Sequence, residues 1–380
     1  MNQKLNWLWA LTIIIFCVYS CKKDDASPVP VISLSVTADT LSVAFGDSVI
    51  IKANVNNNVQ VEHSWKLNDS LFSKTADFRY KPTMAGDYKI VYAGGNAEGH
   101  FTKNIVLRVA APVRPITAGS SKYISVVFDY LPAPGQFVNE EGLGDKNAPK
   151  GIIGGTDALL HLGAYGGYVV FGFDHSILNK PGYDLAIYGN PLPPPMEWSE
   201  PGIVMVSQDK NGNGLPDDEW YELAGSEYSA ATTKKKYTIT YYNPKATADV
   251  QWKDNLGNNG AVEINPFHDH SYYPSFAANQ DSISFTGTVL KNTFGLMDNG
   301  FIYINTGFSF GYADNYSSGD DYAKNHFNSF NIDWAVDTNG KPVQLSSIDF
   351  VKVYTGQNDK GNTLLGEIST EISGAKDLGF

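Results

Sequence analysis

The segments that decide the fold class are GGYVVFGF (166–173), GIVMVSQ (202–208) and IDFVKVYTG (348–356). Each is a short run of β-branched and aromatic residues bounded by turn-forming residues, which is the pattern of a β-strand. Similar runs recur between residues 122 and 356, whereas the helical signal is weak and is strongest in TDALLHL (156–162). We therefore predict that residues 122–380 form one all-β domain, a large β-sandwich of the jelly-roll type.

A second series of alternating runs occupies residues 31–110 and includes SVIIKANV (48–55) and VEHSWKL (61–67). Their length and spacing predict a small β-sandwich with Trp65 in its core. This pattern resembles an Ig-like domain of the PKD type, which implies a spacer and says little about function. Residues 111–121 are rich in Pro, Gly and Ser without periodicity, so we predict a linker there.

The first 30 residues have the pattern of an export signal. Lys4 precedes an apolar run over residues 7–18, which is too short to span a bilayer comfortably, and Ser20-Cys21 follows it. The junction resembles a lipobox, which implies a signal peptide (1–20), lipidation of Cys21 and a lipidated tether (21–30). The charged stretch after Cys21 resembles a surface-export signal of Bacteroidota, so we expect a protein anchored to the outer membrane and facing outward. The alternatives are a short buried strand and a plain solvated linker.

The composition excludes some classes of function. The chain of 380 residues has 40 acidic and 28 basic residues, a formal net charge of −12, and no basic run longer than three residues. Nucleic-acid binding depends largely on Lys and Arg that displace counterions from phosphates, so we do not expect it. Both cysteines lie within the first 21 residues, so the predicted domains contain no disulfide.

The sharpest local motif is DKNGNGLPDDE (209–219). Oxygen donors at alternate positions, followed by a glycine, allow one loop to surround a hard cation. We predict a structural calcium ion whose ligands are Asp209, Asn211, Asn213, the carbonyl of Leu215, Asp217, Asp218 and Glu219. The twelfth position is Trp220 and no amphipathic helix flanks the loop, so it is not an EF-hand. The alternative is a simple Asn-Gly hairpin turn.

Two loops combine aromatic and polar residues, NPFHDHSYYP (265–274) and FSFGYADNYSSGDDY (308–322). The two histidines of the first loop could bind a transition metal, but two ligands alone make a poor site. We instead expect exposed tyrosine rings that could cover a sugar or a planar macrocycle. The predicted ligand-binding residues are Trp198, His268, His270, Tyr272, Tyr273, Tyr312, Asp314, Asn315 and Tyr316.

Signals of catalysis are few. The sequence has no Gly-x-Ser-x-Gly motif, no phosphate-binding glycine loop and no cysteine outside the signal region. Carboxylate pairs such as Glu197 and Glu200 could serve a glycosidase, but solvated surface carboxylates are the favoured interpretation. We expect a binding protein rather than an enzyme.

Three longer stretches carry a family resemblance: residues 166–179, 200–228 and 348–358. They resemble bacterial cell-surface proteins, common in Bacteroidota, that join an N-terminal PKD/Ig-like module to a C-terminal β-sandwich. Such proteins are found beside outer-membrane uptake systems, including those for corrinoids such as vitamin B12. The resemblance implies a lipoprotein that captures a bulky ligand, a corrinoid first and a glycan next, for a TonB-dependent transporter. The alternatives are a glycoside-active enzyme and a structural or adhesive surface protein.

Overall fold

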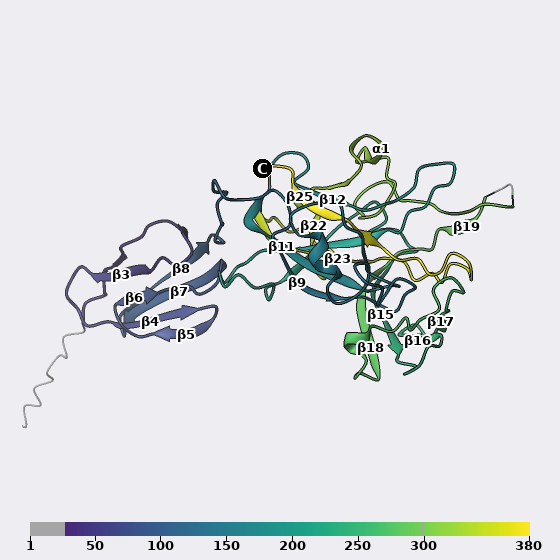
Figure 1. The fold of residues 1–380 in the computed structure, drawn as a ribbon. Helices are drawn as coiled ribbons and strands as arrows, with labels where there is room; N and C mark the ends of the chain where they lie inside the picture. Colours follow the sequence, from purple (N-terminus) through teal and green to yellow (C-terminus); the bar gives the residue numbers. More distant parts are fainter. Residues whose placement is uncertain (1–26, 298–299) are drawn as a thin grey trace, which may run out of the picture. The chain divides into compact units, whose positions relative to one another are not determined.

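The computed structural model describes residues 27–297 and 300–380 (Figure 1). The predicted signal peptide and the predicted lipidation site at Cys21 therefore lie outside the described residues. The chain divides into two compact units. The first comprises the residues up to 42 together with 48–81 and 87–108, and the second comprises 43–47, 82–86 and 109–380.

Two antiparallel sheets form the first unit. One has the order β1 (Ile32–Leu34), β3 (Val49–Val55), β6 (Asp77–Tyr80), and the other has the order β2 (Thr40–Val43), β8 (Gly99–Val109), β7 (Gly86–Asn96), β4 (Glu62–Leu67), β5 (Ser70–Ser73). Trp65 on β4 is fully buried, and its ring centroid lies 5.3 Å from that of Phe78 on β6 and 4.5 Å from that of Tyr92 on β7. Trp65 therefore joins the two sheets, which confirms it as a core residue.

A six-stranded antiparallel sheet is the centre of the second unit (Figure 1). Its order is β22 (Ala335–Val336), β14 (Trp220–Leu223), β13 (Gly202–Ser207), β23 (Ser347–Thr355), β11 (Tyr168–Leu178), β9 (Val126–Leu131). The three segments that decide the fold class in the sequence become the neighbouring strands β13, β23 and β11. These strands are almost entirely buried because the sheet is covered on both faces.

Each face of this sheet has its own core. Alternate residues of β13 point to opposite faces, so Val204 belongs to one apolar cluster and Ile203 to the other. The first cluster includes a three-stranded sheet with the order β21 (Asn328–Phe330), β12 (Leu185–Tyr188), β25 (Gly374–Asp377). The second includes a four-stranded sheet with the order β17 (Asn259–Val262), β16 (Val250–Asp254), β15 (Lys234–Tyr242), β18 (Ser282–Val289). The second unit is thus a layered β-sandwich, and the all-β prediction is confirmed.

The remaining elements are short. Two small antiparallel sheets pair β10 (Leu160–His161) with β24 (Glu371–Ile372) and β19 (Phe294–Leu296) with β20 (Tyr303–Asn305). The described residues contain one α-helix, α1 (Tyr322–Asn325), and three 3₁₀ segments, Ala148–Ile152, Ser275–Ala277 and Ile332–Trp334.

The weak helical signal over residues 156–162 does not produce a helix. Leu160 and His161 form β10 instead, and both are buried. Pairing with β24 outweighs the weak local helical preference, because the tertiary contacts decide the structure of so short a run. Gly163, at a φ of +73°, follows the strand directly. This pairing places His161 opposite Glu371, and both residues belong to the pocket described next.

Candidate ligand-binding pocket

A pocket of about 590 Å³ opens on the second unit and brings together loops that are far apart in the sequence. Its wall is mainly apolar and its floor carries carboxylates. It is lined by Gln136, Phe137, Leu143, Leu159, His161, Asn190, Leu192, Met196, Trp198, Glu200, Asn265, Phe267, His268, Ile302, Tyr303, Leu364, Leu365, Ser369 and Glu371. This volume lies within the range of small-molecule sites, about 300–1,000 Å³.

Exposed apolar side chains gather around this pocket. Six of the large apolar residues that line it are between 39% and 74% exposed, namely Leu192, Met196, Phe267, Tyr303, Leu364 and Leu365. Scattered exposed apolar residues are ordinary, but a contiguous group marks a surface that binds something. The wall is therefore suited to the apolar or planar face of a ligand.

Trp198 is the one predicted site tryptophan, and it lines this wall. Its segment is fixed by two reciprocal backbone hydrogen bonds with Leu192 (2.8 and 3.2 Å). Its ring packs edge-on against Phe294, with a centroid separation of 5.9 Å. Phe294 in turn stacks on Tyr303 at 5.3 Å. The Trp198 ring is thus held in place while remaining half-exposed.

Two carboxylates, Glu200 and Glu371, line the floor of the pocket, and Asp314, which does not line it, completes a cluster with them. One oxygen from each carboxylate can be chosen so that all three lie within 4.8 Å of one another. Glu200 precedes β13, and the backbone N–H of Glu200 donates to the carbonyl of Asp314 (2.9 Å). Glu371 is on β24, and its N–H donates to Asp314 Oδ2 (2.9 Å). Backbone hydrogen bonds therefore bring together three segments that are far apart in the sequence.

Burial and mutual repulsion dominate the electrostatics of this floor. Glu200, Asp314 and Glu371 are at most 8% exposed. Loss of hydration, followed by the neighbouring carboxylates, raises the pKa of each of the three well above its ordinary value. Among the described residues, no lysine or arginine forms an ion pair with any of them.

His161 lies at the edge of the floor. Its Nδ1 is 2.8 Å from Glu371 Oε1, yet the orientation does not form a hydrogen bond, and this buried nitrogen has no hydrogen-bond partner. Burial lowers the pKa of His161 to about 4, so its imidazole is neutral at pH 7. The ring packs against Phe137 with centroids 4.2 Å apart and a tilt of 35° between the ring planes.

The two predicted histidines lie beside each other near the pocket mouth. His268 lines the pocket, and its Nδ1 is 2.8 Å from Glu140 Oε1. His270 Nε2 lies 3.0 Å from the carbonyl of Val138. Both rings are half-buried and both are oriented by protein groups.

The expected exposure of Tyr272 and Tyr273 is wrong, since their exposed fractions are 0% and 3%. The Tyr272 hydroxyl accepts a hydrogen bond from the backbone N–H of Asn265 (2.8 Å), and the Tyr273 hydroxyl donates to the carbonyl of Gln280 (3.4 Å). Tyr312 is also buried, and its hydroxyl accepts from the N–H of Glu227 (3.0 Å). Because each hydroxyl has a partner inside the protein, these rings can fill the core.

The other predicted residues of the Tyr312 loop lie in three different environments. Asp314 reaches the pocket floor, whereas Asn315 is buried and bonds both the N–H and the carbonyl of Phe308 (2.7 Å each). Tyr316 lines a separate cavity together with Glu197 and Lys324. Of the predicted ligand-binding residues, Trp198 and His268 therefore line the pocket, and Asp314 belongs to the carboxylate cluster at its floor.

Most residues that line this pocket were not predicted as site residues, including the titratable residues His161, Glu200 and Glu371. The expectation that Glu200 is a solvated surface carboxylate is wrong, because it is 8% exposed. Its proximity to Trp198 in the sequence was the only available signal. Glu371 lies in a segment rich in Ser and Thr that carries no site motif, and His161 lies in the run with the strongest helical signal.

The predicted calcium loop connects the antiparallel strands β13 and β14. Asp209 accepts backbone hydrogen bonds from Asn213 (3.1 Å) and Gly214 (2.9 Å), and Asp218 accepts from Lys210 (2.8 Å). Other contacts within the loop involve Asn211, Asp217, Leu215 and Glu219, and Glu219 also accepts a hydrogen bond from the Tyr221 hydroxyl on β14. The polar side chains are thus largely engaged with the loop's own donors, and its carboxylates do not form a mutually close trio like that of the pocket floor.

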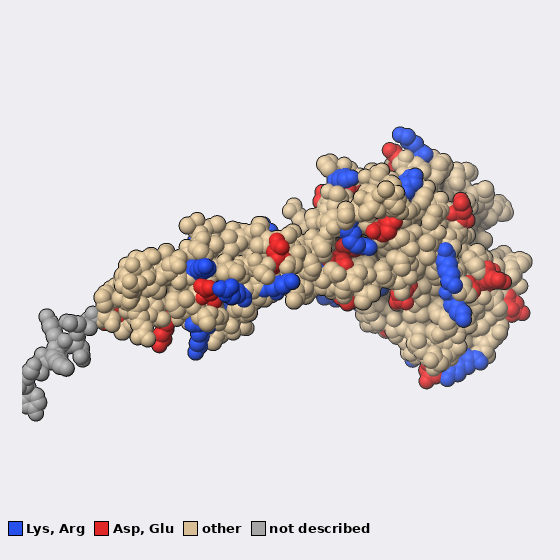
Figure 2. Space-filling view, turned by 60° about the vertical axis from the view of Figure 1, so that its left-hand side comes forward, with Lys and Arg blue, Asp and Glu red and all other residues tan. Residues whose placement is uncertain are grey.

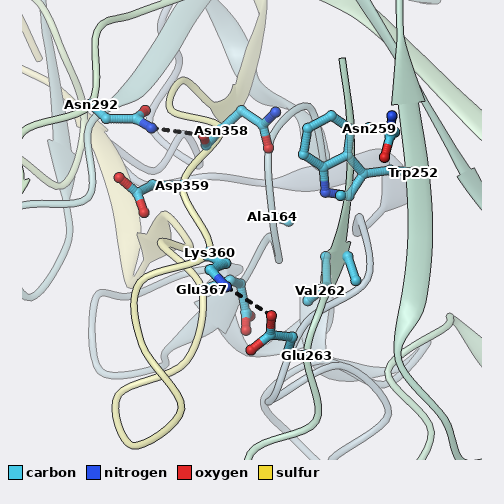
Figure 3. Close-up of a pocket in the computed structure, with 12 residues that line it drawn as sticks. Ala164, Trp252, Asn259, Val262, Glu263, Asn292, Asn358, Asp359, Lys360 and Glu367 are labelled. Carbon is cyan, nitrogen blue, oxygen red and sulfur yellow. Dashed lines mark hydrogen bonds and ion pairs between the residues drawn. The ribbon is translucent and has the colours of Figure 1, made fainter.

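A second cavity of about 370 Å³ lies beside Trp252 (Figure 3). Asn259 lies on the same side of the cavity as this indole ring, and Asn358 and Asp359 face them from a loop. Lys360 Nζ bonds Glu263 Oε1 at 2.8 Å. Glu367 is also part of the lining, and its Oε2 is buried without a hydrogen-bond partner. This cavity is more polar than the first.

The surface charge is mixed. On the face shown in Figure 2, acidic and basic side chains are interspersed and neither sign forms a continuous field. This distribution agrees with the absence of a long basic run in the sequence. In the described part of the chain, no helix has the length and apolar character needed to cross a membrane.

Comparison with known proteins adds little. No protein-family model matches the chain, and no curated protein matches it. Among solved structures, a quinonprotein alcohol dehydrogenase-like protein from Bacteroides thetaiotaomicron is similar at 12% identity and a TM-score of 0.22, over 62% of this chain and 50% of that one. A SusE-like protein is similar at 8% identity and a TM-score of 0.20, over 88% and 93%. The chain thus spans half the length of the first of these, and scores this low support no conclusion about function.

Proposed function

We propose that this chain is a lipid-anchored protein of the outer-membrane surface whose second unit captures a bulky nutrient and passes it to a TonB-dependent transporter. The observation that carries the proposal is the pocket with an exposed apolar wall and a buried polar floor. The lipidation signal at Cys21 supports the anchor. In this proposal the first unit is a spacer.

The pocket favours a ligand with a broad apolar or planar face and a polar edge. Six exposed apolar residues and the half-exposed Trp198 offer ring and aliphatic surface, whereas the polar groups are few and deep. A corrinoid such as vitamin B12 has this character and is the first candidate. A glycan, which needs more hydrogen-bonding partners along the wall, is the second.

The test is calorimetric titration of the purified chain with cobalamin and with a panel of glycans, and Trp198→Ala is the informative variant. Removal of this ring should cost about 1–3 kcal/mol of binding free energy, which weakens binding roughly 5- to 150-fold. Trp252→Ala is the matched control, because this half-buried tryptophan lines the other cavity. It should leave the affinity unchanged.

Each alternative gives a different result. No heat with either ligand class would contradict nutrient capture and favour a structural or adhesive protein. A loss of binding in Trp252→Ala alone would move the site to the second cavity. Release of shortened sugars from the glycan panel would show a glycoside-active enzyme.

We also propose that the loop 209–219 binds a structural calcium ion. The spacing of its oxygen-bearing side chains supports this, and so does its position between two strands of the central sheet. Here the ion would stiffen the loop rather than contact a ligand.

A further inference from the structure

The floor of the pocket contains an unbalanced set of charges. Glu200, Asp314 and Glu371 present mutually close oxygens in a region from which water is almost excluded. A buried carboxylate is normally paired with a cation or bound to a metal. Here, within the described residues, no lysine or arginine balances the three groups. Either protons or a bound cation must reduce their repulsion.

The backbone prepares these groups as anions. Asp314 accepts an N–H from Asn190 at Oδ1 and from Glu371 at Oδ2, both at 2.9 Å. Glu200 Oε1 accepts the N–H of Ser369 at 2.9 Å. Hydrogen bonds donated by amides stabilise the charged form of a carboxylate. These amides oppose the rise in pKa that burial causes and hold the carboxylate oxygens in place, which suits the group to bind a cation.

His161 is an independent indication of a missing partner. Its Nδ1 is buried, lacks a hydrogen-bond partner and approaches Glu371 Oε1 to 2.8 Å from the edge of the trio. Buried nitrogens of this kind are rare unless a water or an ion completes them. A neutral imidazole beside a carboxylate is a common arrangement around metal ions.

We propose that Glu200, Asp314 and Glu371 bind a hard divalent cation, Ca²⁺ or Mn²⁺, at the floor of the pocket, with His161 beside it. Three carboxylate oxygens suit this class of ion, and its two positive charges offset most of their three negative ones. Glu200, Glu371 and His161 line the pocket, whereas Asp314 does not. The open coordination positions therefore face the cavity.

One step of this inference rests on the proposed function, namely that the ion contacts the captured ligand. An ion at the floor would receive an oxygen of the captured ligand, such as a hydroxyl, carboxylate or phosphate group. The apolar wall would hold the rest of the ligand. The metal site itself is tested with metal alone, so its failure and the failure of nutrient capture are distinguishable.

The experiment is titration of the chelator-stripped full chain with Mn²⁺, Ca²⁺ and Zn²⁺ separately, with no nutrient present. Calorimetry gives the number of ions bound, and the electron paramagnetic resonance of free Mn²⁺ gives an independent count. Besides any ion bound by the loop 209–219, wild type should bind one ion of Mn²⁺ or Ca²⁺ that Glu371→Gln binds more than about tenfold more weakly. Glu200→Gln should do the same and retains an oxygen for the N–H of Ser369.

Glu367→Gln is the matched control, because this residue is also fully buried near the pocket but does not belong to the trio. It should bind the ion like wild type. Both trio variants should melt at or above the wild-type temperature in chelator, since each removes buried charge repulsion, and this shows that they fold. The proposal is overturned if wild type takes up no ion, if only Zn²⁺ binds, or if the trio variants bind the same number of ions as wild type with unchanged affinity.

Discussion

The pocket floor and the loop 209–219 are both acidic, but they satisfy their carboxylates differently. In the loop, Asp209 and Asp218 accept hydrogen bonds from amides only a few residues away. At the floor, Glu200, Asp314 and Glu371 come from separate segments and face one another. A local acidic motif can be stable on its own backbone, whereas the convergent one needs a proton or an ion to offset its repulsion.

The largest expected difference between the two regions concerns stability. Asp314→Ala leaves the buried N–H of Glu371 and the partly buried N–H of Asn190 without an acceptor. It should lower the free energy of unfolding by about 2–4 kcal/mol, since an orphaned buried donor costs about 1–3 kcal/mol and a partly buried one less. The measurement is urea denaturation.

Asp217→Ala in the loop is the comparison for that measurement. Asp217 accepts only from the side-chain amides of Asn211 and Asn213. Its replacement, measured in chelator, should change the free energy of unfolding by less than about 1 kcal/mol. Equal losses in the two variants would remove the distinction between a convergent and a local acidic site.

The buried carboxylate of Glu367 should make the free energy of unfolding depend on pH. Complete burial raises the pKa of Glu367 to about 7 from an ordinary value of 4.5, although the N–H of Gln136 opposes the shift. The unfolded chain loses this proton first, so between pH 4.5 and 7 the native state binds more protons and stability falls as pH rises. The ionisation of Glu367 alone should lower the free energy of unfolding by about 3 kcal/mol between pH 4.5 and 7.

The variant Glu367→Gln should therefore show a shallower loss of stability between pH 4.5 and 7 than wild type, measured by urea denaturation in chelator. Glu140→Gln, a half-buried carboxylate near the pocket mouth, is the control and should keep most of the wild-type slope. An unchanged slope in Glu367→Gln would mean that this carboxylate is hydrated in solution.

A smaller effect is expected from the loop. In a Glu371→Gln background, which removes the proposed floor site, chelator should lower the free energy of unfolding by about 2–3 kcal/mol when calcium had been present at 100 times its dissociation constant. Asp217→Asn should abolish this response. Melting curves that coincide with and without chelator would favour the Asn-Gly turn over a calcium loop.

The sequence predicts the sheets well because strand patterning is local. The runs at 166–173, 202–208 and 348–356 became three adjacent strands, and Trp65 became a core residue. The weak helical signal over 156–162 was misleading, because pairing with β24 overrides a weak local preference. Secondary structure was thus predictable wherever the alternation of side chains continued over a whole strand.

The site was less predictable, because convergence is not a local property. Trp198, His268 and Asp314 were predicted from aromatic and polar loops. The structure places the first two in the lining of the pocket and the third in the carboxylate cluster at its floor. Glu371 and His161 could not be predicted, since only the pairing of β10 with β24 brings them to the floor. The burial of Glu200 also could not be predicted, because the sequence around it indicates an exposed carboxylate.

The most direct test of the floor is a crystal of the chain grown with Mn²⁺ and measured at the manganese absorption edge. We predict one anomalous peak among Glu200, Asp314 and Glu371, about 2.0–2.6 Å from their oxygens. Crystals of Glu371→Gln should lack that peak. Carboxyl groups hydrogen-bonded to one another in the wild type, with no peak between them at saturating Mn²⁺, would contradict it.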